Sequence, residues 1–185
     1  MDAHKDFLDT VEQSLAESPQ RHGVRLLVAE PELGADLEGE QLEQARQQVV
    51  LPSITLQPGP LMINELGRVE GLRGDVHGFL VLSGSLTINL VMSERRCTRL
   101  IGPHELVLLD GLETDSIPVS WDWSALGPVR LAIFDERLLL IARRWPALMR
   151  EILKRAAQQT RQACLQQAIS QLPRVEERLL ALFWS

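Results

Sequence analysis

Cysteine is scarce in this chain of 185 residues, and its scarcity excludes several classes of metal site. The two cysteines, Cys97 and Cys164, lie far apart and form no Cys-x-x-Cys pair. A structural zinc site or an iron-sulfur cluster needs a close group of thiolates, alone or with histidines, so neither can be built from cysteine alone. We interpret both cysteines as reduced thiols, and we expect neither a metal nor a cofactor.

Long apolar runs are also lacking. No run reaches the roughly 18 residues that a bilayer-spanning helix requires, and the acidic N-terminus lacks the basic-then-apolar layout of a secretory signal. These two absences predict a cytoplasmic protein without a membrane-bound part.

Motifs of the common enzyme classes are missing as well. The chain contains no Gly-x-Ser-x-Gly elbow, Walker loop or dinucleotide-binding fingerprint. A cupin-like metal enzyme stays open as the weaker alternative, because it needs a His-x-His pair, a glutamate and a later histidine. The corresponding region offers only His77 near Asp75 and His104 near Glu105. We therefore assign no catalytic residue and no metal ligand, and we predict that the protein is not an enzyme.

Charge is distributed unevenly around the net value of -6. Residues 1–50 carry eleven acids, whereas residues 143–161 carry six cations against Glu151 alone. Nucleic-acid binders usually show a basic balance over a whole domain, and a basic helix face is more often simply solvated. Direct DNA binding by this segment is not predicted.

The N-terminal part, residues 1–47, is predicted to form helices and a loop. Apolar residues at helical spacing predict a helix over residues 3–16, and a second short helix is expected over 39–48. Between them, residues 24–29 are predicted to form a strand, and Glu30-Pro-Glu-Leu-Gly34 is a turn-rich loop.

Residues 48–135 have the texture of an antiparallel β-domain. Short apolar or alternating runs are separated by glycine and proline, at 48–56, 78–92, 98–109, 117–123 and 129–134. Gly84 stands between two strand-like segments, where a tight bend needs a residue without a side chain. Trp121 and Trp123 alternate with polar residues and should share one face of their strand. The fold class is α+β, with a jelly-roll-like β-roll.

The remainder, residues 136–172, is predicted to be helical. A short helix over 136–143 is followed by a long one over 146–172, which would extend ~40 Å, longer than a compact sheet can cover. A stripe at steps of three and four predicts a parallel helix pair between two copies of the chain. The predicted interface residues are Met149, Ile152, Ala156, Thr160, Ala163 and Gln167.

Residues 173–185 are predicted to begin a further helix. This helix has far more apolar surface than a free end would carry. Its apolar residues are Val175, Leu179, Leu180, Leu182, Phe183 and Trp184. We expect it to connect to a domain that is not in this chain.

This order of elements resembles the sensor half of the Crp/Fnr superfamily of bacterial transcription regulators. Three segments carry the resemblance: Phe79-Leu-Val-Leu-Ser-Gly-Ser-Leu86, Leu100-Ile-Gly-Pro-His-Glu-Leu106, which is similar to the loop entering the effector site, and Ala168–Trp184. The last is most similar to the actinobacterial branch, where it leads into a winged helix-turn-helix. The resemblance implies a cyclic-nucleotide-binding-like domain in a homodimer, with DNA bound through a separate domain.

The chain departs from the family's phosphate cassette. Cyclic-nucleotide binders use an arginine there to neutralise the cyclic phosphate, but no arginine lies between Arg99 and Arg130. Binding of cyclic AMP or cyclic GMP through this cassette is therefore not predicted.

A different small-molecule effector is the remaining hypothesis. The candidate residues for a cationic or aromatic ligand are His104, Asp110, Glu113, Asp115, Trp121 and Trp123. Two alternatives stay open. In the first, the two tryptophans only pack on the face of their sheet and the acids belong to an exposed loop. In the second, the domain binds no ligand and serves only in dimerisation and protein interaction.

Overall fold

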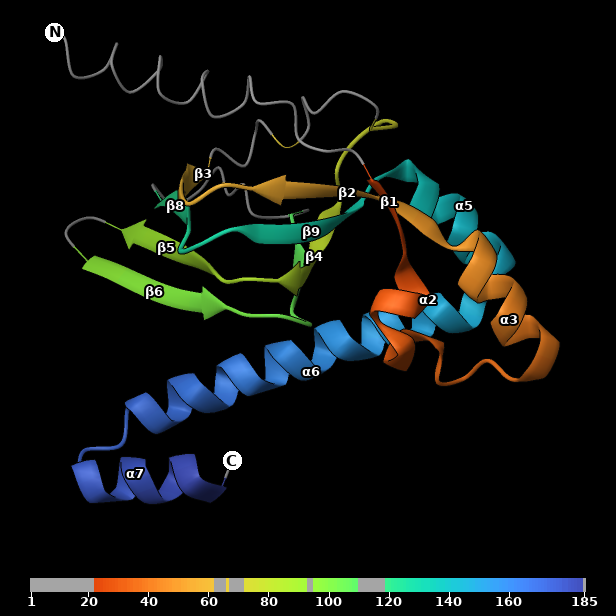
Figure 1. Cartoon of the computed structure of the whole chain (residues 1–185). Helices are drawn as coiled ribbons and strands as arrows, with labels where there is room; N and C mark the ends of the chain where they lie inside the picture. Colours follow the sequence, from red (N-terminus) through yellow and green to blue (C-terminus); the bar gives the residue numbers. More distant parts are fainter. Residues whose placement is uncertain (1–21, 62–65, 67–71, 93–94, 110–118, 185) are drawn as a thin grey trace, which may run out of the picture.

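Two antiparallel sheets and a set of helices build the fold (Figure 1). The computed structural model describes residues 22–61, 66, 72–92, 95–109 and 119–184. The strands are β1 (His22–Arg25), β2 (Val50–Leu56), β3 (Gly59–Leu61), β4 (Gly78–Ser83), β5 (Leu86–Met92), β6 (Arg95–Ile101), β7 (Leu106–Leu108), β8 (Val119–Ala125) and β9 (Val129–Phe134). The helices are α2 (Leu26–Ala29), the 3-10 turn η1 (Pro31–Gly34), α3 (Gly39–Gln48), α5 (Glu136–Arg144), α6 (Pro146–Ser170) and α7 (Val175–Trp184).

The sheets are layered face to face. Within the described residues, one sheet has the order β1-β2-β9-β4-β7 and the other β3-β8-β5-β6. Strand β4 shows the pattern that produces this layering, because Phe79 and Val81 belong to the core between the sheets, while Leu80 belongs to the core under the helices. Successive side chains of a strand point to opposite faces, so one apolar strand supplies both cores. The predicted α+β β-roll is confirmed.

Gly84 makes the bend between β4 and β5. Its φ angle is 82°, and a Cβ at this position would lie 2.4 Å from the carbonyl oxygen of Pro128. Only glycine fits such a close approach with a left-handed backbone. The bend predicted at this residue is confirmed.

The segment after β1 corrects one prediction. A strand was expected over residues 24–29, but the strand ends at Arg25 and Leu26–Ala29 is helical. Leu26 and Leu27 are both buried. A strand would send one of two neighbours outward, whereas a helical turn places both against the outer face of the five-stranded sheet. Strand β3 was not predicted, and the helix expected over 3–16 lies outside the described residues.

The long helix α6 changes its surroundings along its length. Leu148 and Ile152 are buried in the core under the five-stranded sheet, whereas residues 160–168 are exposed. In Figure 1, α6 (blue) runs away from the other helices along the β-roll, and α7 folds back beside it. The helices expected at 136–143 and 146–172 are confirmed, with the second ending at Ser170. No helix in the described part of the chain is long and apolar enough to span a membrane.

Candidate functional site

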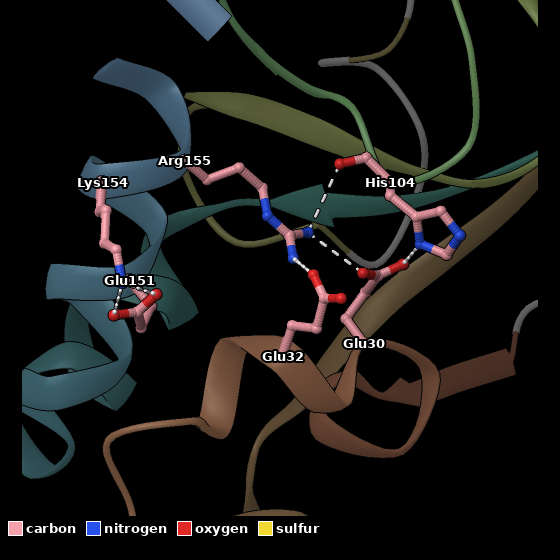
Figure 2. Close-up of polar contacts among 6 residues, drawn as sticks. All are labelled: Glu30, Glu32, His104, Glu151, Lys154 and Arg155. Atoms are coloured by element: carbon pink, nitrogen blue, oxygen red, sulfur yellow. Dashed lines mark hydrogen bonds and ion pairs between the residues drawn. The ribbon is translucent and has the colours of Figure 1, made fainter. Parts of the chain in front are cut away.

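A buried carboxylate, Glu30, lies where the N-terminal turns, the β-roll and α6 meet (Figure 2). Its side chain is only 3% exposed. Oε1 lies 2.6 Å from Nδ1 of His104, and Oε2 accepts a hydrogen bond of 3.1 Å from Arg155. Because a carboxylate oxygen accepts hydrogen bonds, Nδ1 of His104 is assigned as the donor in this contact. Both oxygens of Glu30 therefore have charge-assisted or polar partners, as burial of a carboxylate requires.

Arg155 brings α6 into this cluster. Its side chain is 15% exposed, and besides Glu30 it contacts Glu32 at 3.2 Å and donates to the backbone oxygen of His104 at 3.4 Å. Figure 2 shows the guanidinium pointing from α6 into the space between Glu30, Glu32 and the His104 carbonyl. The planar, multiply donating head of arginine suits such a group of acceptors better than a lysine would. One residue thus joins three separate segments of the chain.

The loop between β6 and β7 is held in a special conformation. His104 has φ 68°, the left-handed region, which is uncommon for a residue with a side chain. Its N–H donates to Val81 O at 2.8 Å, and Val81 N donates to Glu105 O at 3.0 Å, so the loop is anchored to β4. The side-chain contact with Glu30 and the carbonyl contact with Arg155 add two further anchors. The loop's position is therefore linked to that of α6.

A second contact joins α6 to the next residues of the same segment. With its amide oriented so that donor meets acceptor, Gln159 donates to Leu106 O and accepts from Leu106 N, both at 2.9 Å. Strand β7 is an edge strand of the five-stranded sheet, so these backbone groups have no neighbouring strand. Arg155 and Gln159, one helical turn apart, therefore bind residues 104–106 from the same face of α6.

The residues predicted to bind a ligand do not form one site among the described residues. His104 belongs to the polar cluster around Glu30. Trp123 is 4% exposed and packs edge-to-face on Phe79, with ring centroids 6.1 Å apart. Trp121 shares the inner face of the four-stranded sheet but is 37% exposed. Asp110, Glu113 and Asp115 lie outside the described residues. The described part of the chain contains no group of three or more histidine, cysteine or acidic side chains suited to a metal ion.

The predicted dimer stripe divides into two halves. Ile152 is buried in the core of its own chain, and Met149 and Ala156 pack partly against that core. Thr160, Ala163 and Gln167 are exposed. The hydroxyl of Thr160 donates to Ala156 O at 2.9 Å, which satisfies it within the helix. The exposed half of the stripe therefore presents the small Ala163, the locally satisfied Thr160 and the polar Gln167.

Sequence reasoning missed Glu30, Arg155 and Gln159. Arg155 stands among five other cations, and Glu30 in a turn-rich loop, so neither differs from its neighbours by residue type. Their contact joins positions 125 residues apart. The only usable signal was the loop 100–106, which the resemblance had marked and which contains His104.

Comparisons with known proteins bear on the fold. No protein family and no curated protein matches the sequence. Among similar solved structures, OCPA complexed CprK has a TM-score of 0.52 and 15% identity, over 71% of this chain and 58% of that one. The Thermus thermophilus catabolite activator protein gives 0.47 and 23%, over 74% and 62%. The N-terminal domain of a transcriptional regulator from Streptomyces coelicolor A3(2) gives 0.42 and 22%, over 73% and 90%.

CprK is a Crp/Fnr regulator, so its structure confirms the fold that the resemblance implies. At 15% identity the similarity concerns the fold alone. The chain spans between about half and three fifths of the length of CprK and of the catabolite activator protein.

Proposed function

We propose that this chain is the sensor and dimerisation part of a Crp/Fnr-like, DNA-binding transcription regulator in the cytoplasm. The β-roll receives a signal, α6 pairs with its copy in a second chain, and DNA is bound by a domain outside these 185 residues. The usual phosphate cassette is not used, because its arginine is missing. The role is one of binding, not of catalysis.

The observation that carries this proposal is the attachment of α6 to residues 104–106. Arg155 and Gln159 contact the loop that, by resemblance, enters the effector site. A ligand that moves this loop changes the acceptors available to Arg155, and therefore the direction in which α6 leaves the β-roll. Such a link between a binding site and a helix at a subunit interface is a common form of allosteric transition.

The exposed half of α6 supports pairing of two chains. Thr160, Ala163 and Gln167 continue the stripe after the helix has passed its own core. The small Ala163 and the satisfied hydroxyl of Thr160 permit close approach of two helices. An isologous contact of this kind brings each residue near its own copy. The proposed seam is therefore formed by Thr160, Ala163 and Gln167.

The experiment that tests the proposal is sedimentation equilibrium of wild type and Ala163→Glu. Ala163 is exposed and does not belong to either core, so the change places two carboxylates at the seam without disturbing the monomer fold. We expect a dimer for wild type and a monomer with unchanged far-UV circular dichroism for Ala163→Glu.

Gln158→Glu is the matched control, because it adds the same charge to an exposed position of α6 outside the stripe. It should remain dimeric. A monomeric wild type, or a dimer that Ala163→Glu leaves intact, would show that this helix face is not the interface.

A further inference from the structure

Among the described residues the two sheets end in four edge strands, and β6 differs from the other three. β1, β3 and β7 are four, three and three residues long, and the amide of Gln159 pairs with Leu106 of β7. β6 is seven residues long, contains no proline and pairs with β5 in an unbroken register. Proteins usually keep their edge strands short, interrupted or covered, because an open edge accepts further strands. β6 is therefore the edge to which another strand is most easily added.

The side of β6 that faces away from β5 is open. Residues 95–100 are all exposed, and only Ile101 is buried. In Figure 1, β6 (green) lies at the margin of the β-roll, next to β5. In an antiparallel pair, every second residue directs its N–H and C=O groups toward the neighbouring strand, and the residues between direct theirs away from it. β6 therefore presents a row of backbone donors and acceptors on its open side.

Three of the seven residues of β6 are arginines, and none is acidic. Arg95 and Arg99 point to one face of the sheet and Arg96 to the other, because successive side chains alternate. Arg96 lies 3.9 Å from Asp122. Arg99 lies 3.4 Å from Glu105. All four of these side chains are exposed by a third or more. Exposed ion pairs are weak, so the carboxylates of a bound chain can replace these partners.

The same arginines disfavour a second copy of the chain as the partner. Two β6 strands paired antiparallel about Thr98 would place Arg95 of one chain diagonally beside Arg99 of the other. Long side chains reach each other across such diagonal positions, and like charges there repel. A strand with carboxylates at these positions would be attracted instead. The charge of β6 therefore favours an acidic strand.

We infer that β6 binds an extended acidic segment of another protein, which adds to the four-stranded sheet as an antiparallel strand. Its main chain pairs with the open side of β6, and its side chains determine which segment fits, as in other cases of strand addition. Two carboxylates four residues apart lie opposite Arg95 and Arg99, and a third lies opposite Arg96. An apolar side chain lies opposite Leu100, which is 59% exposed. This inference goes beyond the proposed function, because it assigns a protein partner to the β-roll.

A synthetic peptide with this pattern tests the inference: fluorescein-labelled Thr-Ile-Glu-Thr-Val-Glu-Glu-Thr with an amidated C-terminus. In the antiparallel register its isoleucine lies opposite Leu100, and its glutamates lie opposite the three arginines. Binding to the 185-residue chain is measured by fluorescence anisotropy. We expect the peptide to bind, and its counterpart with glutamine in place of glutamate to bind at least about tenfold more weakly, since three exposed ion pairs are lost. A single-stranded oligothymidylate of equal length should not displace the peptide.

Backbone methylation separates strand addition from a purely electrostatic contact, because it removes an N–H donor without changing any side-chain charge. Two versions of the peptide carry methyl groups on alternate backbone nitrogens, in the two possible phases. Only the version whose methylated nitrogens face β6 should lose binding, by about tenfold or more. The other version should bind like the unmodified peptide, because only alternate residues bond to a neighbouring strand.

Protein variants locate the contact on β6. Arg95→Gln and Arg99→Gln should each weaken binding of the peptide by about two- to fivefold. Arg143→Gln removes the same charge from an exposed position of α5, so it is the matched control and should bind like wild type. Amide hydrogen exchange should slow at alternate residues of β6 when the peptide is bound, and remain unchanged in β3, the other edge of the sheet.

Absence of binding, equal loss of binding for the two methylated peptides, or unchanged exchange in β6 would overturn the inference. Equal affinities of the glutamate and glutamine peptides, or equal effects of the three arginine variants, would do so as well. Displacement by oligothymidylate would also overturn it, because β6 would then be a general polyanion site. Sedimentation of the wild-type chain reports the pairing of α6 separately. A dimer that ignores the peptide therefore contradicts this inference alone and leaves the proposed function standing.

Discussion

At the scale of single residues, Glu30 determines how the N-terminal turns and α6 are held together. Burying a carboxylate is costly unless its oxygens are paired, and here the partners come from the β6–β7 loop and from α6. Once Glu30 is buried, both partners are needed. The cluster therefore favours one arrangement of three segments over others.

Replacing Arg155 should reveal this dependence. Arg155→Met keeps the aliphatic part of the side chain but leaves Glu30 buried with His104 as its remaining partner. We expect the free energy of unfolding to fall by about 2–3 kcal/mol, somewhat less than for a fully buried pair because Arg155 is partly exposed. Urea denaturation followed by circular dichroism measures the loss.

Arg150→Met is the matched control on the same helix. Its ion pair with Asp36, at 3.3 Å, is largely exposed, so its loss should change stability by less than about 0.5 kcal/mol. Equal losses for the two variants would mean that Glu30 does not depend on Arg155.

At the scale of elements, α6 and strand β7 depend on each other. β7 is short and lies at the edge of its sheet, where unpaired backbone groups face either solvent or another chain. Gln159 pairs with Leu106 in the way a neighbouring strand would. The helix thus closes the sheet edge while its own position is fixed.

Removing this amide should loosen the edge. Gln159→Leu keeps a similar volume but leaves the N–H and C=O of Leu106 without their partner, which should cost about 1–2 kcal/mol of stability. Amide hydrogen exchange at Leu106 should accelerate, while Gln158→Leu, at an exposed position, should leave it unchanged. Unaltered exchange at Leu106 in Gln159→Leu would exclude the contact.

Local sequence patterns predicted those helices, strands and bends whose formation depends on the local sequence itself. Strand β9, helix α5 and the bend at Gly84 follow from apolar runs, a helical spacing and a backbone requirement. The strand predicted over residues 24–29 was wrong because a short apolar run such as Leu26 and Leu27 fits a buried strand and a buried helix equally well. Only the sheet that buries both side chains decides between the two. The Glu30 cluster was beyond prediction, since its partners approach each other only after the sheets have formed.

At the scale of the whole molecule, the proposed function is a coupling between the β-roll and a helix pair. In this proposal, a signal on the β-roll passes through residues 104–106 and reaches α6 at Arg155 and Gln159. The exposed half of α6 carries it to the second chain. The contacts of Arg155 and Gln159 with residues 104–106 are polar and can exchange partners, as a two-state linkage requires.

The dimer dissociation constant of Arg155→Met, measured by sedimentation equilibrium under conditions where the variant remains folded, tests this coupling most directly. Arg155 lies outside the seam, so it can influence pairing only through the direction of α6. The coupling predicts that the dimer dissociation constant of Arg155→Met is at least about tenfold higher than that of wild type, equivalent to ~1.4 kcal/mol. The dissociation constant of Arg150→Met should equal that of wild type. Identical constants for wild type and Arg155→Met would contradict it, because the β-roll and the helix pair would then be independent.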